Sequence, residues 1–503
     1  MSDDPRPSGV PPERVHYGEG YRRSVALLLM LAYTANSADR TLVAIIGQPM
    51  KQDLGLSDTQ LGLLVGTAFA FLYAFSGIPV ARLAERANRV RIIAIAATAW
   101  SLLTALLGSA QSFLQLLLIR TGVGVFEAGC TPPAHSLLSD YFEPRRRTTA
   151  LSFYSCGISL GYIASAMIGG WVALHYGWRA ACRVVGLPGI LVALAIARFV
   201  EEPPRGNADP SRRGAAAARA GPAGGVRHEL SQLAAVARRL LLRRPIAHIV
   251  IGVTIATFAA QGSYAFVPAY FRRAFALDYA TIGVVTGLAG GVSVALGLVI
   301  GGLVTDRLGA RAPKWYALTP AIGLVVCTPV YVAAFVAGGW LASAWLIGIA
   351  AFFQYVSFGP TFGIVQNVVD ARQRATATAL IYILLNLIGL GLGPVFTGWL
   401  IDRCADFNFS HGTPGSVFAS FTAMLDGAPG TGASYHASCP PGSEGDAACR
   451  AALALASRQG IAVTVLLYAW SAVHYFLGAF GLEEEMCAAA RHNASTESPT
   501  ESA

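Results

Sequence analysis

The chain has 503 residues, of which 54% are apolar and only 13% are charged. Average globular domains carry about a quarter charged residues, so this composition excludes a disordered chain, a nucleic-acid-binding domain and a disulfide-stapled secreted domain. The net charge of +9 does not indicate a nucleic-acid partner here, because in membrane proteins a basic excess marks the cytoplasmic loops.

Apolar segments long enough to cross about 30 Å of hydrocarbon recur along the chain. They are much longer than the roughly ten-residue alternating strands of a membrane barrel, and lipid admits only helices or closed barrels. The sequence therefore predicts an all-α membrane protein with twelve transmembrane helices. These cover residues 24–49, 58–82, 91–109, 113–139, 147–174, 180–200, 246–271, 280–304, 314–338, 340–369, 375–401 and 459–482.

The predicted helices divide into two six-helix bundles. Lys and Arg concentrate on the loops that share a side with the N-terminus, which predicts that both termini are cytoplasmic. The first helix has no cleavage site before it, so no signal peptide is expected. The expected layout is a tail at 1–23, a first bundle at 24–200, a linker at 201–245, a second bundle at 246–482 with a long outer loop at 403–458, and a tail at 483–503. The linker segment 228–244 has the spacing of an amphipathic helix.

The two bundles show an internal repeat. Glu85-Arg86 after the second helix corresponds to Asp306-Arg307 after the eighth, and the Gly161–Trp171 segment corresponds to Gly389–Trp399. Repeated halves are characteristic of secondary transporters, which bind their substrate between the halves near the bilayer midplane.

Four ionisable residues lie inside the predicted spans, all in the first bundle: Asp39, Arg40, Arg120 and Glu127. Each costs several kcal/mol in the bilayer unless it faces a partner or water, so a functional role is expected. Asp39 and Arg120 are at depths that allow them to pair, and Arg120 and Glu127 share one face of their helix. We expect Asp39 and Glu127 to carry protons, with Arg120 as the partner that modulates them. The alternative is a static ion pair that only holds the two helices together.

The repeated acid–base segments suggest a gate. Glu85, Arg86 and Arg89, and their counterparts Asp306 and Arg307, lie at cytoplasmic helix ends where they can bond a neighbouring helix terminus. The alternative is a charge cluster that only sets the orientation in the membrane.

The second bundle offers polar and aromatic side chains but no buried acid or base. Gln261, Tyr264 and Tyr355 are its candidate substrate contacts, beside Gln354, Gln366 and Asn367. An apolar wall opposite a charged one suits an amphipathic solute with its head toward Arg40 or Arg120. Aromatic residues in such helices can equally face lipid or pack in the core.

The sequence has no motif for a cofactor or metal: Walker A, His-Glu-x-x-His and Cys-x-x-Cys are absent. Cys404, Cys439 and Cys449 share the predicted outer loop, where one disulfide is plausible, but the sequence does not choose its pairing.

Three stretches resemble a known family. Asn36-Ser-Ala-Asp39-Arg40, Arg120 to Glu127-Ala128, and Leu137-Leu-Ser-Asp140-Tyr-Phe, together with the repeated halves, resemble the major facilitator superfamily, and within it a bacterial member of the spinster lipid-transporter family. The resemblance implies proton-linked transport of lysophospholipids or sphingosine-1-phosphate by alternating access. It implies that the membrane acid is Asp39 and that its partners are Arg120 and Glu127. The first loop motif departs from the family pattern at Ala81, Glu85 and Asn88.

These observations predict a secondary active transporter, not an enzyme. We expect a monomer in a bacterial inner membrane, whose partners are a lipid-like solute, protons and the bilayer. Asn36, Arg40, Arg120 and Glu127 are the expected substrate contacts of the first bundle. A carrier of small organic anions or sugar acids is the alternative within the superfamily. A membrane-embedded lipid enzyme is a remote alternative, because no catalytic polar cluster appears at the interface.

Overall fold

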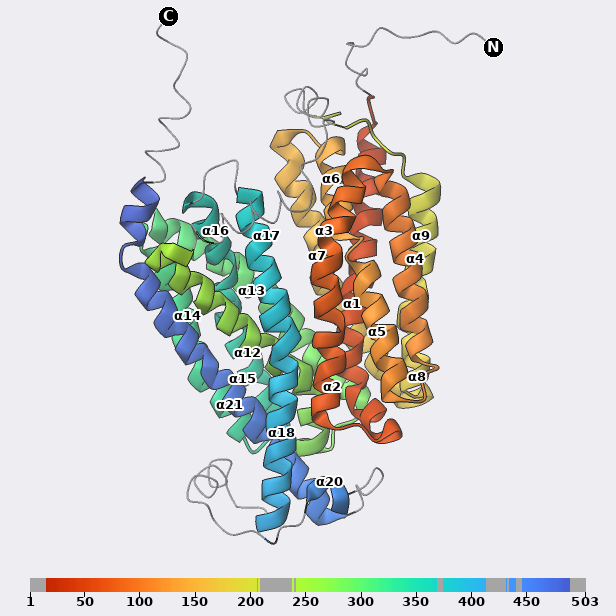
Figure 1. Ribbon diagram of the computed structural model, residues 1–503, viewed down its shortest axis with the longest axis vertical. Helices are drawn as coiled ribbons and strands as arrows, with labels where there is room; N and C mark the ends of the chain where they lie inside the picture. Colours follow the sequence, from red (N-terminus) through yellow and green to blue (C-terminus); the bar gives the residue numbers. More distant parts are fainter. Residues whose placement is uncertain are drawn as a thin grey trace, which may run out of the picture.

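The computed structural model describes residues 15–205, 207–208, 238, 241–368, 374–412, 431, 434–439 and 446–488. This described part is helical, without strands. Its helices form two bundles side by side, and the start of α1 and the end of α21 lie at the same end of the molecule (Figure 1). We call this end the termini end.

In the described residues the first bundle contains nine helices. They are α1 (Glu19–Leu54), α2 (Asp58–Val65), α3 (Thr67–Arg86), α4 (Arg89–Leu107), α5 (Phe113–Glu127), α6 (Thr131–Tyr141), α7 (Pro144–Tyr176), α8 (Trp178–Gly186) and α9 (Pro188–Phe199). Three expected helices are therefore interrupted, at Gly66, after Glu127 and at Leu187. Proline follows two of these breaks, where its missing N–H fits the first turn of a new helix.

Helix α2 begins with a capping box. The Ser57 hydroxyl accepts the amide of Gln60 at 3.0 Å, and the Gln60 side chain accepts the amide of Ser57 at 2.9 Å. These bonds satisfy donors that a helix start otherwise leaves free. They fix the position at which α2 starts, next to the second bundle.

The second bundle has the corresponding set. It contains α12 (Arg244–Phe275), α13 (Tyr279–Gly309), α14 (Trp315–Val336), α15 (Trp340–Val356), α16 (Phe358–Val368), α17 (Arg374–Leu384), the π-helix η1 (Leu385–Leu390), α18 (Gly391–His411), α20 (Tyr435–Ser438) and α21 (Ala447–Ala479). Helix α18 ends later, and α21 begins earlier, than the sequence predicted. The interval between these two helices is therefore 412–446, not 403–458. The predicted amphipathic helix at 228–244 lies almost wholly outside the described residues.

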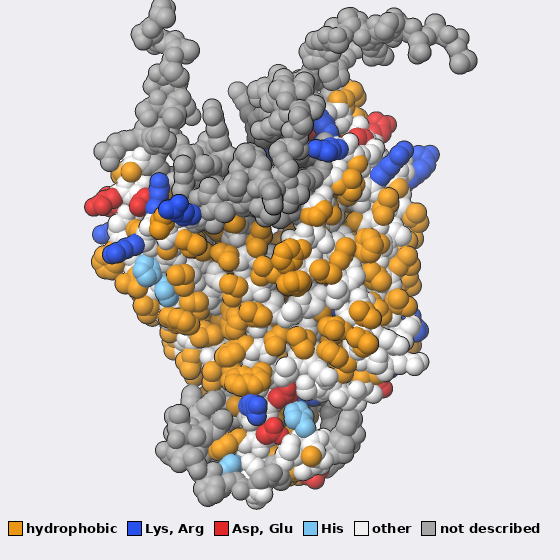
Figure 2. All heavy atoms as spheres, viewed as in Figure 1, with side chains coloured by type: hydrophobic (Ala, Val, Ile, Leu, Met, Phe, Trp, Pro, Cys, Tyr) orange, Lys and Arg blue, Asp and Glu red, His pale blue; other side chains and the backbone are white. Residues whose placement is uncertain are grey.

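Eleven spans of the described chain are long and apolar enough to cross a membrane, and apolar side chains cover the visible flank of both bundles (Figure 2). Helix α1 is not among the eleven, because Asn36, Asp39 and Arg40 lower its hydropathy. Its 36 residues extend about 54 Å at roughly 1.5 Å per residue, which exceeds the hydrocarbon thickness. With α1 the fold is that of a twelve-span membrane protein.

The bundles meet mainly along two pairs of helices, α2 with α18 and α7 with α13. Glycines permit this close approach: a Cβ on Gly62 would collide with the carbonyl of Pro394, and one on Gly398 with the carbonyl of Asp58. The α2–α18 contact lies toward the end opposite the termini (Figure 1). We call that end the closed end.

Candidate functional site

A charged cluster lies inside the first bundle, where α1 and α5 contribute one acid and one arginine each. Asp39, Arg120 and Glu127 are each only 1% exposed. Arg40 donates from Nε to Glu127 Oε2 at 2.6 Å. Within the described residues no ion pair joins Asp39 to Arg120, so the structure pairs Glu127 with Arg40 instead of forming the expected Asp39–Arg120 contact.

Aromatic rings hold the two arginines in place. The guanidinium carbon of Arg40 lies 4.7 Å from the ring centre of Phe69 and 4.6 Å from that of Tyr73. The guanidinium of Arg120 lies 4.9 Å from the same Phe69 ring. Such cation–π contacts stabilise a cation where water is scarce, so Phe69, which the sequence did not single out, positions both arginines.

Several buried polar atoms of this cluster have no hydrogen-bond partner in the described structure. They are both polar side-chain atoms of Asn36, Oδ2 of Asp39, Nε and Nη1 of Arg120, and Oε1 of Glu127. Nearly all buried polar groups in proteins are hydrogen-bonded. Their concentration at one place is typical of a site that receives a polar group from a solute or from water.

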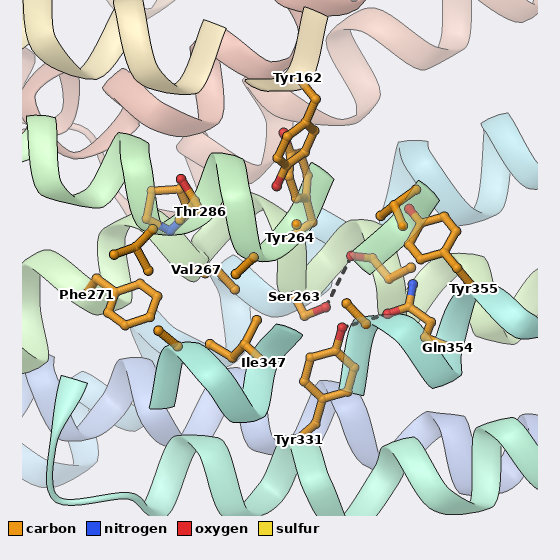
Figure 3. Close-up of a pocket in the computed structure, with 18 residues that line it drawn as sticks. Tyr162, Ser263, Tyr264, Val267, Phe271, Thr286, Tyr331, Ile347, Gln354 and Tyr355 are labelled. Carbon is orange, nitrogen blue, oxygen red and sulfur yellow. Dashed lines mark hydrogen bonds between the residues drawn. The ribbon is translucent and has the colours of Figure 1, made fainter. Parts of the chain in front are cut away.

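The second bundle has an apolar cavity of about 70 Å³, lined mainly by α12, α13 and α15. Tyr264 and Tyr355 line it, as expected, and Tyr162 enters it from α7 of the first bundle (Figure 3). The rings of Tyr162 and Tyr264 are 5.2 Å apart. The described lining residues carry no charge, and Tyr331 donates to the side chain of Gln354 at 2.7 Å. Gln261 lies on α12 but does not line this cavity.

The predicted gate residues differ in burial and in their contacts. Arg89 is fully buried and joins Asp140 of α6 and Glu202, each at 2.5 Å. Arg86, Asp306 and Arg307 are exposed, and Asp306 accepts a bond from Tyr316 at 3.3 Å. Glu85 belongs to α3, but its side chain is outside the described part. Gln366 and Asn367 lie in α16, and their side chains are likewise not described.

A second charged cluster, which the sequence did not reveal, joins the two bundles at the closed end. Asp58 at the start of α2 is fully buried and binds Lys51 at 2.6 Å. Arg273 of α12 donates from Nη2 to Asp58 Oδ1 at 2.5 Å and from Nη1 to Oδ2 at 3.1 Å. The same arginine donates from Nε to Gln48 at 2.8 Å. This bidentate pair therefore links the bundles without exposure to solvent.

Asp402 of α18 forms the other half of this link. Its carboxylate accepts the backbone amides of Asp58 at 3.0 Å and Thr59 at 2.8 Å, so it caps a helix of the opposite bundle. His436 of α20 lies 3.5 Å from Asp402 Oδ1. The nearby disulfide joins Cys439 to Cys449, whereas Cys404 is a buried free thiol.

No group of three or more His, Cys, Asp or Glu side chains in the described ranges is placed to hold a metal ion.

Comparison with known proteins agrees with this architecture. The Major Facilitator Superfamily model matches residues 29–394. An MFS-type efflux pump of Mycolicibacterium smegmatis is 32% identical over 396 residues, which cover 77% of this chain and 86% of that protein. A probable L-galactonate transporter of Escherichia coli is 26% identical, with coverage of 78% and 86%.

A solved structure extends the similarity to nearly the whole chain. It is the inward-facing, unoccupied form of a bacterial homologue of the human lysosomal transporter spinster, with a TM-score of 0.78 and 30% identity. The match covers 93% of this chain and 99% of that one. The chain therefore belongs to the Major Facilitator Superfamily of transporters, and within that family it is similar to a bacterial member of the spinster group.

Proposed function

We propose that the protein is a proton-coupled, alternating-access carrier of an amphipathic solute of the lysophospholipid or sphingosine-1-phosphate type. The observation that carries this proposal is the asymmetry of the two bundles. One offers a buried cluster with two arginines, and the other offers an apolar, aromatic cavity that Tyr162 reaches from the first bundle.

The charged head of the solute would bind at the first bundle. Arg40 and Arg120 are the cations for a phosphate or phosphocholine-like head, with Asn36 as a hydrogen-bond partner. The acyl tail would extend into the cavity beside Tyr264 and Tyr355. Each buried CH₂ group contributes about 0.8 kcal/mol, so the part of the tail that enters the cavity adds to the binding free energy.

Proton coupling would use Asp39 and Glu127. The Arg40–Glu127 ion pair favours the charged carboxylate, whereas burial without a partner favours the protonated acid. A solute head that draws Arg40 away from Glu127 therefore favours protonation of Glu127. This competition links solute binding to proton uptake and needs only the residues already in contact.

We propose that the termini end is cytoplasmic and that the protein works as a monomer. With this orientation the described structure is closed toward the outside. Opening there would require breaking the Asp58–Arg273 contact and the Asp402 cap, while Arg86, Asp306 and Arg307 would contribute to closure on the cytoplasmic side.

A carrier of sugar acids is the second candidate, and the similarity to a probable L-galactonate transporter favours it. Both candidates use the arginines for an anion, but a sugar acid has no tail to fill the apolar cavity. The cavity therefore distinguishes them.

Flux into proteoliposomes tests the two candidates directly. Labelled lysophosphatidylcholine and labelled galactonate are compared with and without a pH gradient. Ala351→Phe fills the cavity, so it should lower lipid flux at least tenfold and leave galactonate flux unchanged if both are carried. Flux of galactonate but not of the lipid would overturn the lipid proposal and keep the fold.

Proton coupling has its own control. Asp39→Asn and Glu127→Gln should abolish flux driven by a pH gradient, whereas Glu19→Gln, at an exposed position of α1, should not. Retention of gradient-driven flux in both site variants would contradict the coupling.

A further inference from the structure

A cavity lies beside the charged link at the closed end. It has a volume of about 200 Å³ and three arginines in its wall, Arg272, Arg273 and Arg450, with Gln48, Tyr435 and Leu453 among the other lining residues. None of the lining residues within the described ranges is acidic. Positive charge concentrated in a concave site raises the local concentration of anions. We call this cavity the arginine pocket.

The three arginines differ in exposure and in the hydrogen-bond partners they already have. Arg273 is 3% exposed and already binds Asp58, Gln48 and Ser457. Arg272 donates to the carbonyl of Leu277 at 3.2 Å. Arg450 is exposed and has no side-chain partner among the described residues. Two guanidiniums thus retain donors for a ligand, while the third belongs to the link between the bundles.

A disulfide bond connects two segments of the pocket wall. Tyr435 belongs to α20, Arg450 to the first turn of α21, and the Cys439–Cys449 disulfide connects these two segments. Two of the lining residues are therefore held in one position relative to each other, which lowers the entropy cost of binding.

We propose that the arginine pocket binds an oxyanion group presented from outside the closed end, and that the bound oxyanion competes with Asp58 for Arg273. Guanidiniums present paired donors that match a phosphate or carboxylate group. Because Arg273 also holds the two bundles together, an oxyanion that shares its donors weakens that link. The pocket would then couple outside anions to opening of the closed end, whichever solute the protein carries.

Inorganic phosphate is the probe for binding. Full-length protein in phosphatidylcholine nanodiscs is titrated with phosphate at constant ionic strength, and the melting temperature and the heat of binding are recorded. Saturable binding is expected, and Arg450→Gln and Arg272→Gln should each weaken it about tenfold, the loss typical of one charge-assisted hydrogen bond. Arg403→Gln is the matched control, an exposed arginine of α18 outside the pocket.

A second arm distinguishes a free anion from a lipid head group. The same variants are compared in nanodiscs with phosphatidylglycerol and without phosphate. If Arg272 and Arg450 stabilise the protein in the phosphatidylglycerol discs but phosphate has no effect, the oxyanion belongs to a lipid head group. If neither phosphate nor phosphatidylglycerol acts, or if all variants respond equally, the pocket is not a binding site.

A distance measurement tests whether the bound oxyanion competes with Asp58 for Arg273. Spin labels at Gln111→Cys and Gly338→Cys, both exposed, report the separation of the two bundles at the closed end, in a background with the exposed thiols replaced by Cys156→Ser and Cys487→Ser. Saturating phosphate should increase the population of the longer distance, and Arg450→Gln should cancel that increase. An unchanged distance distribution at saturation overturns the competition with Asp58.

Discussion

The two ends of the molecule use buried charge in opposite ways. At the closed end, Asp58, Arg273 and Asp402 bond across the two bundles. At the termini end, Arg89 bonds Asp140 of the first bundle and Glu202 in the segment that follows it. Opening the closed end therefore breaks polar contacts, whereas the Arg89 cluster survives any rigid movement of one bundle relative to the other. In the proposed mechanism, the first cluster would control the opening of the closed end, and the second would hold one bundle together.

The largest expected effect comes from Asp58→Asn. This change leaves Lys51 and Arg273 buried without their counter-charge, a loss that typically costs about 3–5 kcal/mol. Spin-label distances across the closed end should shift strongly toward the open form. Asp53→Asn is the control, because Asp53 pairs with Arg179 at the same end but on the surface, where a pair contributes about 0–1 kcal/mol. Equal shifts in both variants would contradict the assigned role of Asp58.

Arg89→Gln tests whether the termini end and the closed end act independently. It removes the cation between Asp140 and Glu202. Because these two side chains are 10% and 23% exposed, we expect a loss of stability of the first bundle of about 3 kcal/mol, the lower end for a broken buried pair. The melting temperature should fall while the closed-end distance stays unchanged. Arg91→Gln, at an exposed position of the same helix, should change neither. A changed closed-end distance in Arg89→Gln would show that the two ends are coupled.

Much of the fold could be predicted from the sequence, because long apolar segments have few alternatives in lipid. The charged cluster of the first bundle could be predicted for the same reason, since buried charge is conspicuous in a membrane helix. Its pairing could not: depth along a helix does not determine whether Arg40 or Arg120 faces Glu127, and this choice depends on helix rotation and on the position of Phe69.

The closed-end cluster was missed for a different physical reason. The sequence placed Asp402 and Arg273 in loops, because a charge next to an apolar segment normally marks its end. Helices α12 and α18 instead continue past these residues. The capping box at Ser57 was the available signal, since it fixes Asp58 in the first turn of a helix.

Gly398→Ala should weaken the closed end through packing alone. The added methyl group would collide with the carbonyl of Asp58, and such overpacking costs about 1–2 kcal/mol. The open population at the closed end should rise less than for Asp58→Asn. Gly302→Ala has open space around its Cβ and provides the control. If both alanine variants behave alike, the effect is one of helix propensity and not of contact between the bundles.

The smallest effect concerns His436. Its hydrogen bond to Asp402 raises the pKa of its imidazole, although partial burial opposes this. A raised pKa means that the contact is fully present below the ordinary value of about 6.5 and is lost as the pH rises through the raised pKa. Lys51 and Asp406 also lie near the His436 imidazole and affect its charge. Because the His436 side chain is 42% exposed, we expect its contact with Asp402 to contribute less than about 1 kcal/mol to stability.

The measurement for His436 is the melting temperature at pH 5.5 and 8.5, because His436 and Asp402 both belong to the second bundle and their contact persists when the bundles separate. The contact should stabilise the protein more at the lower pH, and His436→Gln should remove this contribution. His175→Gln, at an exposed position near the end of α7, should preserve it. A pH dependence that persists in His436→Gln would assign the effect to other groups.

The π-helix η1 has a mechanical consequence. It interrupts one long helix between α17 and α18, and a π-bulge is a place where a helix can bend. The part beyond it is fixed to the first bundle through Asp402, and Thr67 bonds the carbonyl of Gly391 at 2.6 Å immediately after η1. In the proposed transport cycle, helix α17 would therefore pivot as a separate segment while α18 remains anchored, so that the spacing of the bundles at the termini end would change before the closed end opens.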